Sequence, residues 1–234
     1  MPELDTGEGE LNAQLPQYKI TNACSLFAEL IAVVDVGSPE KGRLGWAILP
    51  VGITGGSIGE LVHHVAAALL HGPVSLGFEA PLWVPLRLDP MKLTRKREGE
   101  GSRPWSANAG AAVLATGLAV VPHILQEIRK AAPRAIASMN YRNPPNVPGS
   151  LFVWEAFVSR EDKGEGHEED ALLAARSFEF ACTDLAAHQR IPPEQSLNLL
   201  GAALLRTGWT SDVSVLGEEV LVLKQLTRTT REER

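Results

Sequence analysis

The stretch that most constrains the fold is residues 31–50, IAVVDVGSPEKGRLGWAILP. An apolar run ends at Asp35, a glycine-containing turn follows, and a second apolar run covers residues 44–49. This order predicts two antiparallel strands joined by a loop. A run as apolar as residues 30–34 is typical of a strand covered on both faces. Because a carboxylate is costly to bury without a partner or a metal, Asp35 lies either at the exposed end of its strand or in a site.

Composition limits the classes of protein to which the chain can belong. Its 234 residues, 44% hydrophobic and 21% charged, are ordinary for a globular protein of one large or two small domains. The 22 Lys and Arg against 28 Asp and Glu give a formal net charge of −6. Such a chain is a poor general-purpose coat for nucleic acid, because phosphate binding depends on positive surface. Local basic patches can still contribute.

The sequence predicts a cytoplasmic protein without membrane contact. The acidic start MPELDTGEGE lacks the basic and apolar parts of a signal peptide. Residues 107–121 come closest to a membrane span but are too short. Cys24 and Cys182 lie far apart and outside any CxxC pair. This argues against a zinc site or a disulfide framework and fits a reducing compartment.

Alternating strand and helix patterns predict one α/β domain over residues 18–226, between a loose tail at 1–17 and a charged tail at 227–234. After the first two strands, the expected elements are a short strand within 51–56, a helix at 57–70 capped by Ser57, a strand from 74 that ends at Glu79, a helix at 107–132 kinked or split by Pro122, a strand beginning within 133–136, a strand at 151–158 that contains Glu155, helices at 168–188 and 194–205, and a terminal hairpin or strand pair at 208–223.

Acidic residues on four separate elements are the candidate metal ligands: Asp35, Glu79, Glu155 and Asp170. The ends of neighbouring strands in an open α/β sheet carry functional groups, and the first turn of the last long helix could bring Asp170 to the same edge. Clustered carboxylates repel unless protons or cations intervene, and oxygen ligands suit Mg²⁺ or Mn²⁺. Two such ions about 3.5–4 Å apart would clamp a phosphodiester. The alternative is that these are ordinary solvated acids.

Four motifs, in order, resemble those of a known family. They are DVGSPEKGRLGWAIL around Asp35, FEAPLWVP around Glu79, VWEAFV around Glu155 and EEDALLAA around Asp170. Together they resemble the uncharacterised family of predicted ribonuclease H-like nucleases. The resemblance implies a mixed five-stranded sheet of order 3-2-1-4-5 with helices on both faces, here with a C-terminal helix and strand extension. It also implies catalytic roles for Asp35, Glu79 and Asp170 as metal ligands, with Glu155 as a fourth.

The loop after the Glu79 turn is the candidate substrate contact. Its basic residues could grip a phosphate backbone, and tryptophan could stack on bases. We therefore assign substrate binding to Arg95, Arg97, Arg103 and Trp105. The alternative is a solvated loop with packed tryptophans.

The sequence thus predicts a divalent-metal-dependent nuclease or phosphodiesterase that acts on nucleic acid or a nucleotide-like phosphodiester. One rival is an ATP-dependent phosphotransferase of the actin and sugar-kinase superfamily, with DVGSPEKG as its first phosphate loop; that superfamily also needs a second domain, for which 234 residues are short. Another is a non-catalytic module of the same fold that binds nucleic acid or protein. The sequence leaves the oligomeric state open, a homodimer included.

Overall fold

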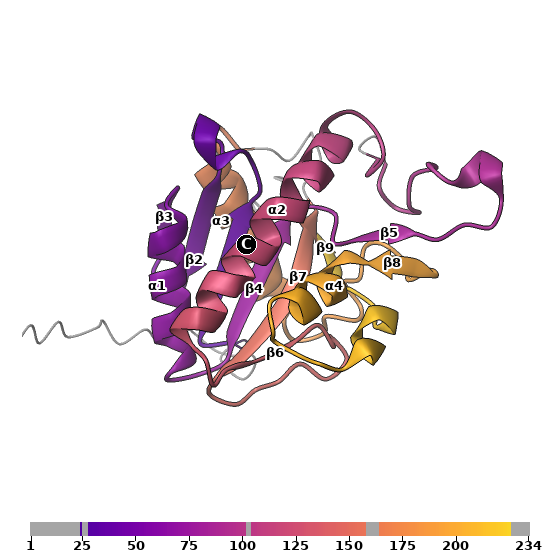
Figure 1. Cartoon of the computed structure of the whole chain (residues 1–234). Helices are drawn as coiled ribbons and strands as arrows, with labels where there is room; N and C mark the ends of the chain where they lie inside the picture. Colours follow the sequence, from indigo (N-terminus) through magenta and orange to yellow (C-terminus); the bar gives the residue numbers. More distant parts are fainter. Residues whose placement is uncertain (1–23, 25–27, 102–103, 158–163, 226–234) are drawn as a thin grey trace, which may run out of the picture.

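The structure is a computed structural model that describes residue 24 and residues 28–101, 104–157 and 164–225 (Figure 1). The tails expected at 1–17 and 227–234 lie outside these residues. The described part is an α/β fold built on a seven-stranded mixed sheet. Its strands are β1 (Leu30–Asp35), β2 (Gly45–Leu49), β3 (Ile53–Gly55), β4 (Val74–Glu79), β6 (Ile136–Ser138), β7 (Ser150–Phe157) and β9 (Val222–Lys224).

The strand order is β3-β2-β1-β4-β7-β6, and β9 also pairs with β7. The first hairpin is antiparallel as predicted, and β1, β4 and β7 are parallel. The start of the expected order, 3-2-1-4, is confirmed, and the long strand β7 takes the fifth place. The expected count of five strands is wrong. The eight residues of β7 are long enough for β6 to pair with its first half and β9 with its second.

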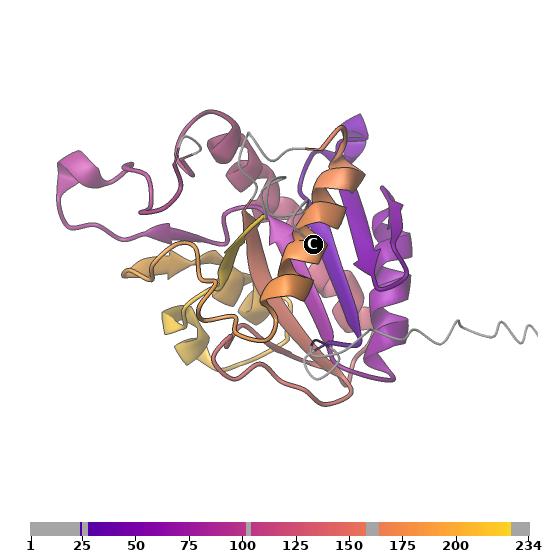
Figure 2. The ribbon, with the colours of Figure 1, turned by 180° about the vertical axis from the view of Figure 1, so that it is seen from behind.

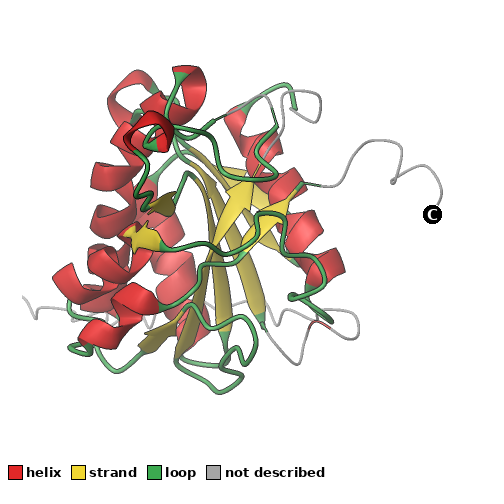
Figure 3. Ribbon diagram, turned by 90° about the vertical axis from the view of Figure 1, so that its right-hand side faces the viewer, coloured by secondary structure: helices red, strands yellow, loops and turns green. Residues whose placement is uncertain are grey.

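The two faces of the sheet are covered by different helices. Since side chains alternate along a strand, Ala32 and Val34 point into one core cluster while Ile31 and Val33 point into the other. The helices are α1 (Ile58–Leu69), α2 (Asn108–Ala131), α3 (His167–Ala181) and α4 (Leu199–Arg206). Helices α1, α2 and α4 lie on the first face, and α3 lies on the second (Figures 1 and 2). Figure 3 shows the sheet between these helical layers.

Helix α2 is continuous through Pro122, so the expected alternative of a split at this residue is wrong. Buried Val120, Val121 and Ile124 hold it against the first core on both sides of the proline. By length and composition alone, this 24-residue helix is apolar enough to cross a membrane, which the sequence reading did not expect. The core helices of globular proteins also pass this test.

Two expectations for the C-terminal part are wrong. Residues expected to start a helix at 194 instead form β8 (Ser196–Asn198), which pairs with β5 (Trp83–Pro85). Helix α4 begins at Leu199 because the Asn198 side chain accepts a hydrogen bond from the N–H of Gly201. The expected terminal hairpin is replaced by the 3₁₀ turn η5 (Val213–Gly217) and the single strand β9.

The two cysteines form a disulfide, contrary to the expectation from their spacing. Cys182 is the C-cap residue of α3, and the fold brings it to Cys24, 158 residues away in the sequence. Sequence distance therefore gave no information on spatial distance. Because the two cysteines are paired, they no longer argue for a protein of a reducing compartment.

Candidate metal centre

The first two acids of the site end neighbouring strands. Strands β1 and β4 are parallel, and their register places Asp35 directly opposite Glu79. In β1, Ile31 and Val33 face α3, and Asp35 continues this alternation on the same face. Glu79 faces the same side because it is the register partner of Asp35, so the two carboxylates share the α3 side of the sheet. The expectation that these two acids lie side by side is confirmed.

The third acid is brought to the same edge by a close approach of α3. Gly45 lies opposite Asp35 in β2, and a Cβ there would lie 2.5 Å from the backbone carbon of His167, the first residue of α3. Only a glycine lets the helix start so near the sheet. Asp170 then sits in the first turn of α3, where its Oδ1 accepts a 2.6 Å hydrogen bond from the N–H of Gly164.

The three acids form a compact cluster. One carboxylate oxygen each of Asp35, Glu79 and Asp170 lies within 4.8 Å of the other two. Asp35 is 4% exposed and Asp170 3%, while Glu79 is half-buried. Carboxylates at this separation repel one another strongly where water is scarce, so the ionised cluster favours a cation. These are the described residues that could hold a metal ion.

A histidine that the sequence reading missed joins the cluster. His167 Nδ1 lies 2.5 Å from Oδ2 of Asp35. His167 is three residues before Asp170 at the start of α3, and residues at this spacing share a helix face. That spacing is the signal in the sequence that could have identified it, once Asp170 was chosen.

Glu155 does not join the cluster, so its expected role as a fourth ligand is not supported. In the parallel pair of β4 and β7, Glu155 lies opposite Phe78 rather than Glu79. A shift of one residue places a side chain on the other face of a sheet. Glu155 therefore points to the side that α2 covers, away from the face shared by Asp35 and Glu79.

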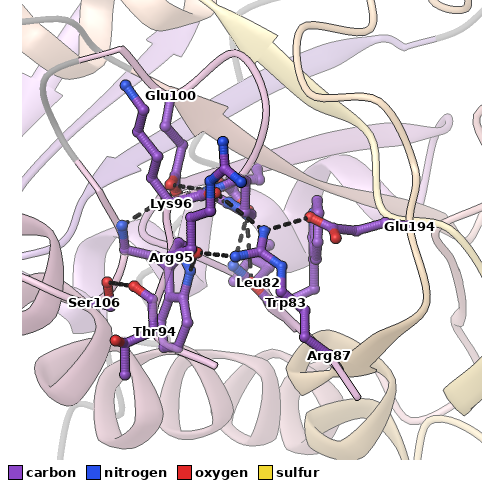
Figure 4. A network of polar contacts seen from close by, with 12 residues as sticks. Leu82, Trp83, Arg87, Thr94, Arg95, Lys96, Glu100, Ser106 and Glu194 are labelled. Atoms are coloured by element: carbon purple, nitrogen blue, oxygen red, sulfur yellow. Dashed lines mark hydrogen bonds and ion pairs between the residues drawn. The ribbon is translucent and has the colours of Figure 1, made fainter. Parts of the chain in front are cut away.

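Glu155 instead forms a buried ion network with Arg97. The guanidinium donates from Nη2 to Glu155 Oε1 at 2.6 Å and from Nη1 to Oε2 at 3.0 Å, and its Nε donates to Glu100 Oε1 at 2.7 Å. The N–H of Leu82 also donates to Glu155 Oε2, at 2.9 Å. Through Glu155, this network connects the loop that carries Arg97 and Glu100 to the turn that follows Glu79. Figure 4 shows Glu100, Leu82 and Trp83 among the residues of this region.

The network carries one positive charge against two negative ones. Burial raises the pKa of Glu155 above its ordinary value; Arg97 and the Leu82 N–H oppose this, and Glu100 adds to it. Burial alone would lower the pKa of Arg97, but its two carboxylate partners outweigh it and the pKa is raised. Arg97 is therefore a charged group committed to internal partners.

The four predicted substrate contacts differ in their placement. Arg97 is 1% exposed and paired with two carboxylates, an arrangement that does not favour its predicted contact with substrate. Arg95 is exposed. Trp105 is half-buried; its backbone N–H donates to Glu100 Oε1, and it lines a small pocket that also includes Glu79. Arg103 lies outside the described residues.

Comparison with family models, curated proteins and solved structures finds no match to this chain.

Proposed function

We propose that this chain is a divalent-metal-dependent nuclease or phosphodiesterase with a ribonuclease H-like fold. The observation that carries the proposal is the convergence of Asp35, Glu79 and Asp170 from two strands and a helix to within 4.8 Å. The strand order β3-β2-β1-β4-β7 supports the fold assignment, because it agrees with the order that the sequence motifs imply.

The donor set fits a hard cation. Three carboxylates offer oxygen ligands only, which Mg²⁺ and Mn²⁺ prefer over nitrogen or sulfur donors. Asp35, Glu79 and Asp170 would hold the ion, and all three come from regular elements that fix their positions. When bound, such an ion supplies a Lewis acid for a phosphoryl oxygen and lowers the pKa of its water.

The chain's own residues help to orient the site. The contact between His167 and Oδ2 of Asp35 helps to orient that carboxylate. Glu79 also lines the small pocket that Trp105 and Val113 line, on the side of the loop that carries Arg97.

The charge around the site explains why an anionic substrate needs the metal. Three carboxylates, together with the excess negative charge of the nearby Arg97 network, would repel a phosphodiester. Cations reverse that repulsion. Exposed Arg95 and Lys96, on the loop that follows, add positive charge for the rest of a nucleic-acid chain.

The direct test is cleavage of a panel of single- and double-stranded RNA and DNA, with a simple phosphodiester such as bis(p-nitrophenyl) phosphate. We expect cleavage with Mg²⁺ or Mn²⁺ that a chelator abolishes and that Asp35→Asn lowers at least about 100-fold. Glu168→Gln is the matched control, because Glu168 is exposed in the same turn as Asp170. Cleavage that survives in Asp35→Asn, or none on any substrate, would contradict the proposal.

A further inference from the structure

The ladder between β4 and β7 stops one residue short of Glu79. The parallel pairing of these strands ends at Phe78, which lies opposite Glu155. Glu79 has its register partner on the other side, at Asp35 of β1. On the β7 side, the position of Glu79 therefore depends on how the turn that follows it, residues 80–82, is held.

The side chain of Glu155 holds this turn. Its Oε2 accepts a 2.9 Å hydrogen bond from the N–H of Leu82, which follows Glu79 by three residues. Leu82 is 3% exposed, so its N–H needs an acceptor inside the protein. Glu155 and Leu82 are 73 residues apart in the sequence, and their hydrogen bond connects β7 to the chain that carries Glu79.

The carboxylate that accepts this hydrogen bond is itself fixed. The Arg97 guanidinium donates to both oxygens of Glu155, at 2.6 and 3.0 Å, and a two-point contact of this kind sets the orientation of a carboxylate. Arg97 also donates to Glu100 and lies over the ring of Trp83, 4.7 Å from its centre. The oxygen that accepts from Leu82 therefore has a defined position.

Two helices hold the same turn from other directions. The carbonyl oxygen of Leu82 accepts from two N–H groups at the start of α4, both at 3.0 Å. Ala80 packs so closely against α2 that a Cβ at Gly117 would lie 3.1 Å from the Cβ of Ala80. The turn is thus held by α2, by α4 and, through Glu155, by the sheet.

We propose that Glu155 is a positioning residue for Glu79. It holds no ion itself; by accepting from the Leu82 N–H, it sets the path of the turn after β4 and thereby the place of the Glu79 carboxylate in the acid cluster. This role rests on the proposed function, in which Glu79 is a ligand of the ion. Groups that orient a metal ligand from behind typically contribute about 10- to 100-fold to metal affinity. The role also explains why an acid stays buried on the face away from the cluster, where burial without partners would be costly.

Two substitutions of equal charge separate this role from that of a metal ligand. Glu155→Gln keeps an oxygen that accepts from Leu82, whereas Glu155→Leu offers none. Both leave Arg97 with Glu100 as its carboxylate partner, so the two networks carry the same charge.

The first measurement is calorimetric titration of the full chain with Mn²⁺. We expect the dissociation constant to rise at least about 10-fold in Glu155→Leu and to stay within about threefold of the wild-type value in Glu155→Gln. Glu100→Gln is the control, because it removes one negative charge from the same network and leaves the hydrogen bond between Glu155 and Leu82 in place. This control should leave Mn²⁺ binding unchanged.

The bound ion gives a second measurement. At saturating Mn²⁺, the electron paramagnetic resonance spectrum of Glu155→Leu should differ from that of the wild type, because Glu79 meets the ion in another orientation, and the spectrum of Glu155→Gln should match it. A fold that is merely less stable lowers the occupancy of the site without changing the spectrum of the bound ion. Circular dichroism checks the fold of each variant. Glu155→Asp, which keeps the charge and withdraws the oxygen by one methylene, replaces Glu155→Leu if that variant does not fold.

The outcomes distinguish this role from the proposed function. Equal losses of affinity in Glu155→Gln and Glu155→Leu would overturn the positioning role in favour of a ligand or a charge effect. Unchanged affinity and spectrum in Glu155→Leu would also overturn it. In both cases the wild type binds Mn²⁺, so the proposed function stands. A wild type that binds no Mn²⁺ would contradict the proposed function, and the positioning role with it.

Discussion

Replacing Arg97 with methionine removes the single positive charge that two buried carboxylates share. The side chains of Arg97, Glu155 and Glu100 are each at most 1% exposed, so water cannot replace the lost partner. The variant also loses the hydrogen bonds that the guanidinium donates to both acids. Arg95 lies two residues earlier and is exposed, so the same substitution there removes the same charge from a side chain that water surrounds. The pair of variants therefore separates burial from loss of charge.

The expected loss of stability is large. Removing one partner of a buried ion pair costs about 3–5 kcal/mol, because the other charge stays buried without compensation. For a domain of this size, that corresponds to a fall in Tm of roughly 6–20 °C. Arg95→Met should change the free energy of unfolding by less than about 0.5 kcal/mol, as exposed substitutions usually do.

The loss should also depend on pH. The pKa of Glu155 is already raised by burial, and the loss of Arg97 removes the main opposing influence. A carboxyl whose folded pKa is raised contributes stability below its unfolded pKa and loses that contribution as pH rises through the folded value. The destabilisation of Arg97→Met should therefore be smaller at pH 5 than at pH 7.

Urea unfolding followed by circular dichroism, at both pH values, gives these free energies. The account of the network would be refuted if Arg97→Met cost less than about 1 kcal/mol at pH 7, or if it matched Arg95→Met. A loss that grew as the pH was lowered would contradict the raised pKa of Glu155.

Two further predictions concern the approach of α3 and the disulfide. Gly45→Ala should weaken Mn²⁺ binding at least about 10-fold by pushing the start of α3 away from the sheet. Gly59→Ala is the control, because a Cβ there meets nothing closer than 3.7 Å, and it should leave binding unchanged. Equal affinities of the two variants in calorimetry would exclude this role for Gly45. The disulfide between Cys24 and Cys182 closes a loop of 158 residues, so its reduction should lower the free energy of unfolding by up to about 5 kcal/mol. Two thiols that react with a thiol reagent in the untreated protein would show that the bond is absent.

The local patterns of the sequence were sufficient to predict the centre of the fold. Alternation of apolar runs with acids at their ends located β1 and β4, and the capped amphipathic pattern located α1 with Ser57 as its cap. The same pattern, an acid at the end of each apolar run, predicted that Asp35 lies beside Glu79. These features depend on neighbours in sequence, which is why a single chain reveals them.

The errors that affect the site involve relations between distant segments. Glu155 was assigned to the cluster as an acid within a strand, in the motif VWEAFV, but the register of β7 against β4 turns it to the opposite face. Arg97 was read as a surface cation, although its partner lies 58 residues away on β7. The residues of β8 were predicted to be helical from their local propensity. In the structure, their pairing with β5 overrides that propensity. Register and long-range pairing do not appear in local patterns.

The central claim is that Asp35, Glu79 and Asp170 bind a divalent cation, and calorimetric titration with Mn²⁺ and Mg²⁺ tests it most directly. We predict saturable binding that Asp170→Asn weakens at least about 10-fold and that Glu168→Gln, one exposed acid removed from the same helix turn, leaves unchanged. Absence of binding to the wild-type protein at millimolar concentrations of either ion, or equal affinity in wild type and Asp170→Asn, would contradict the account.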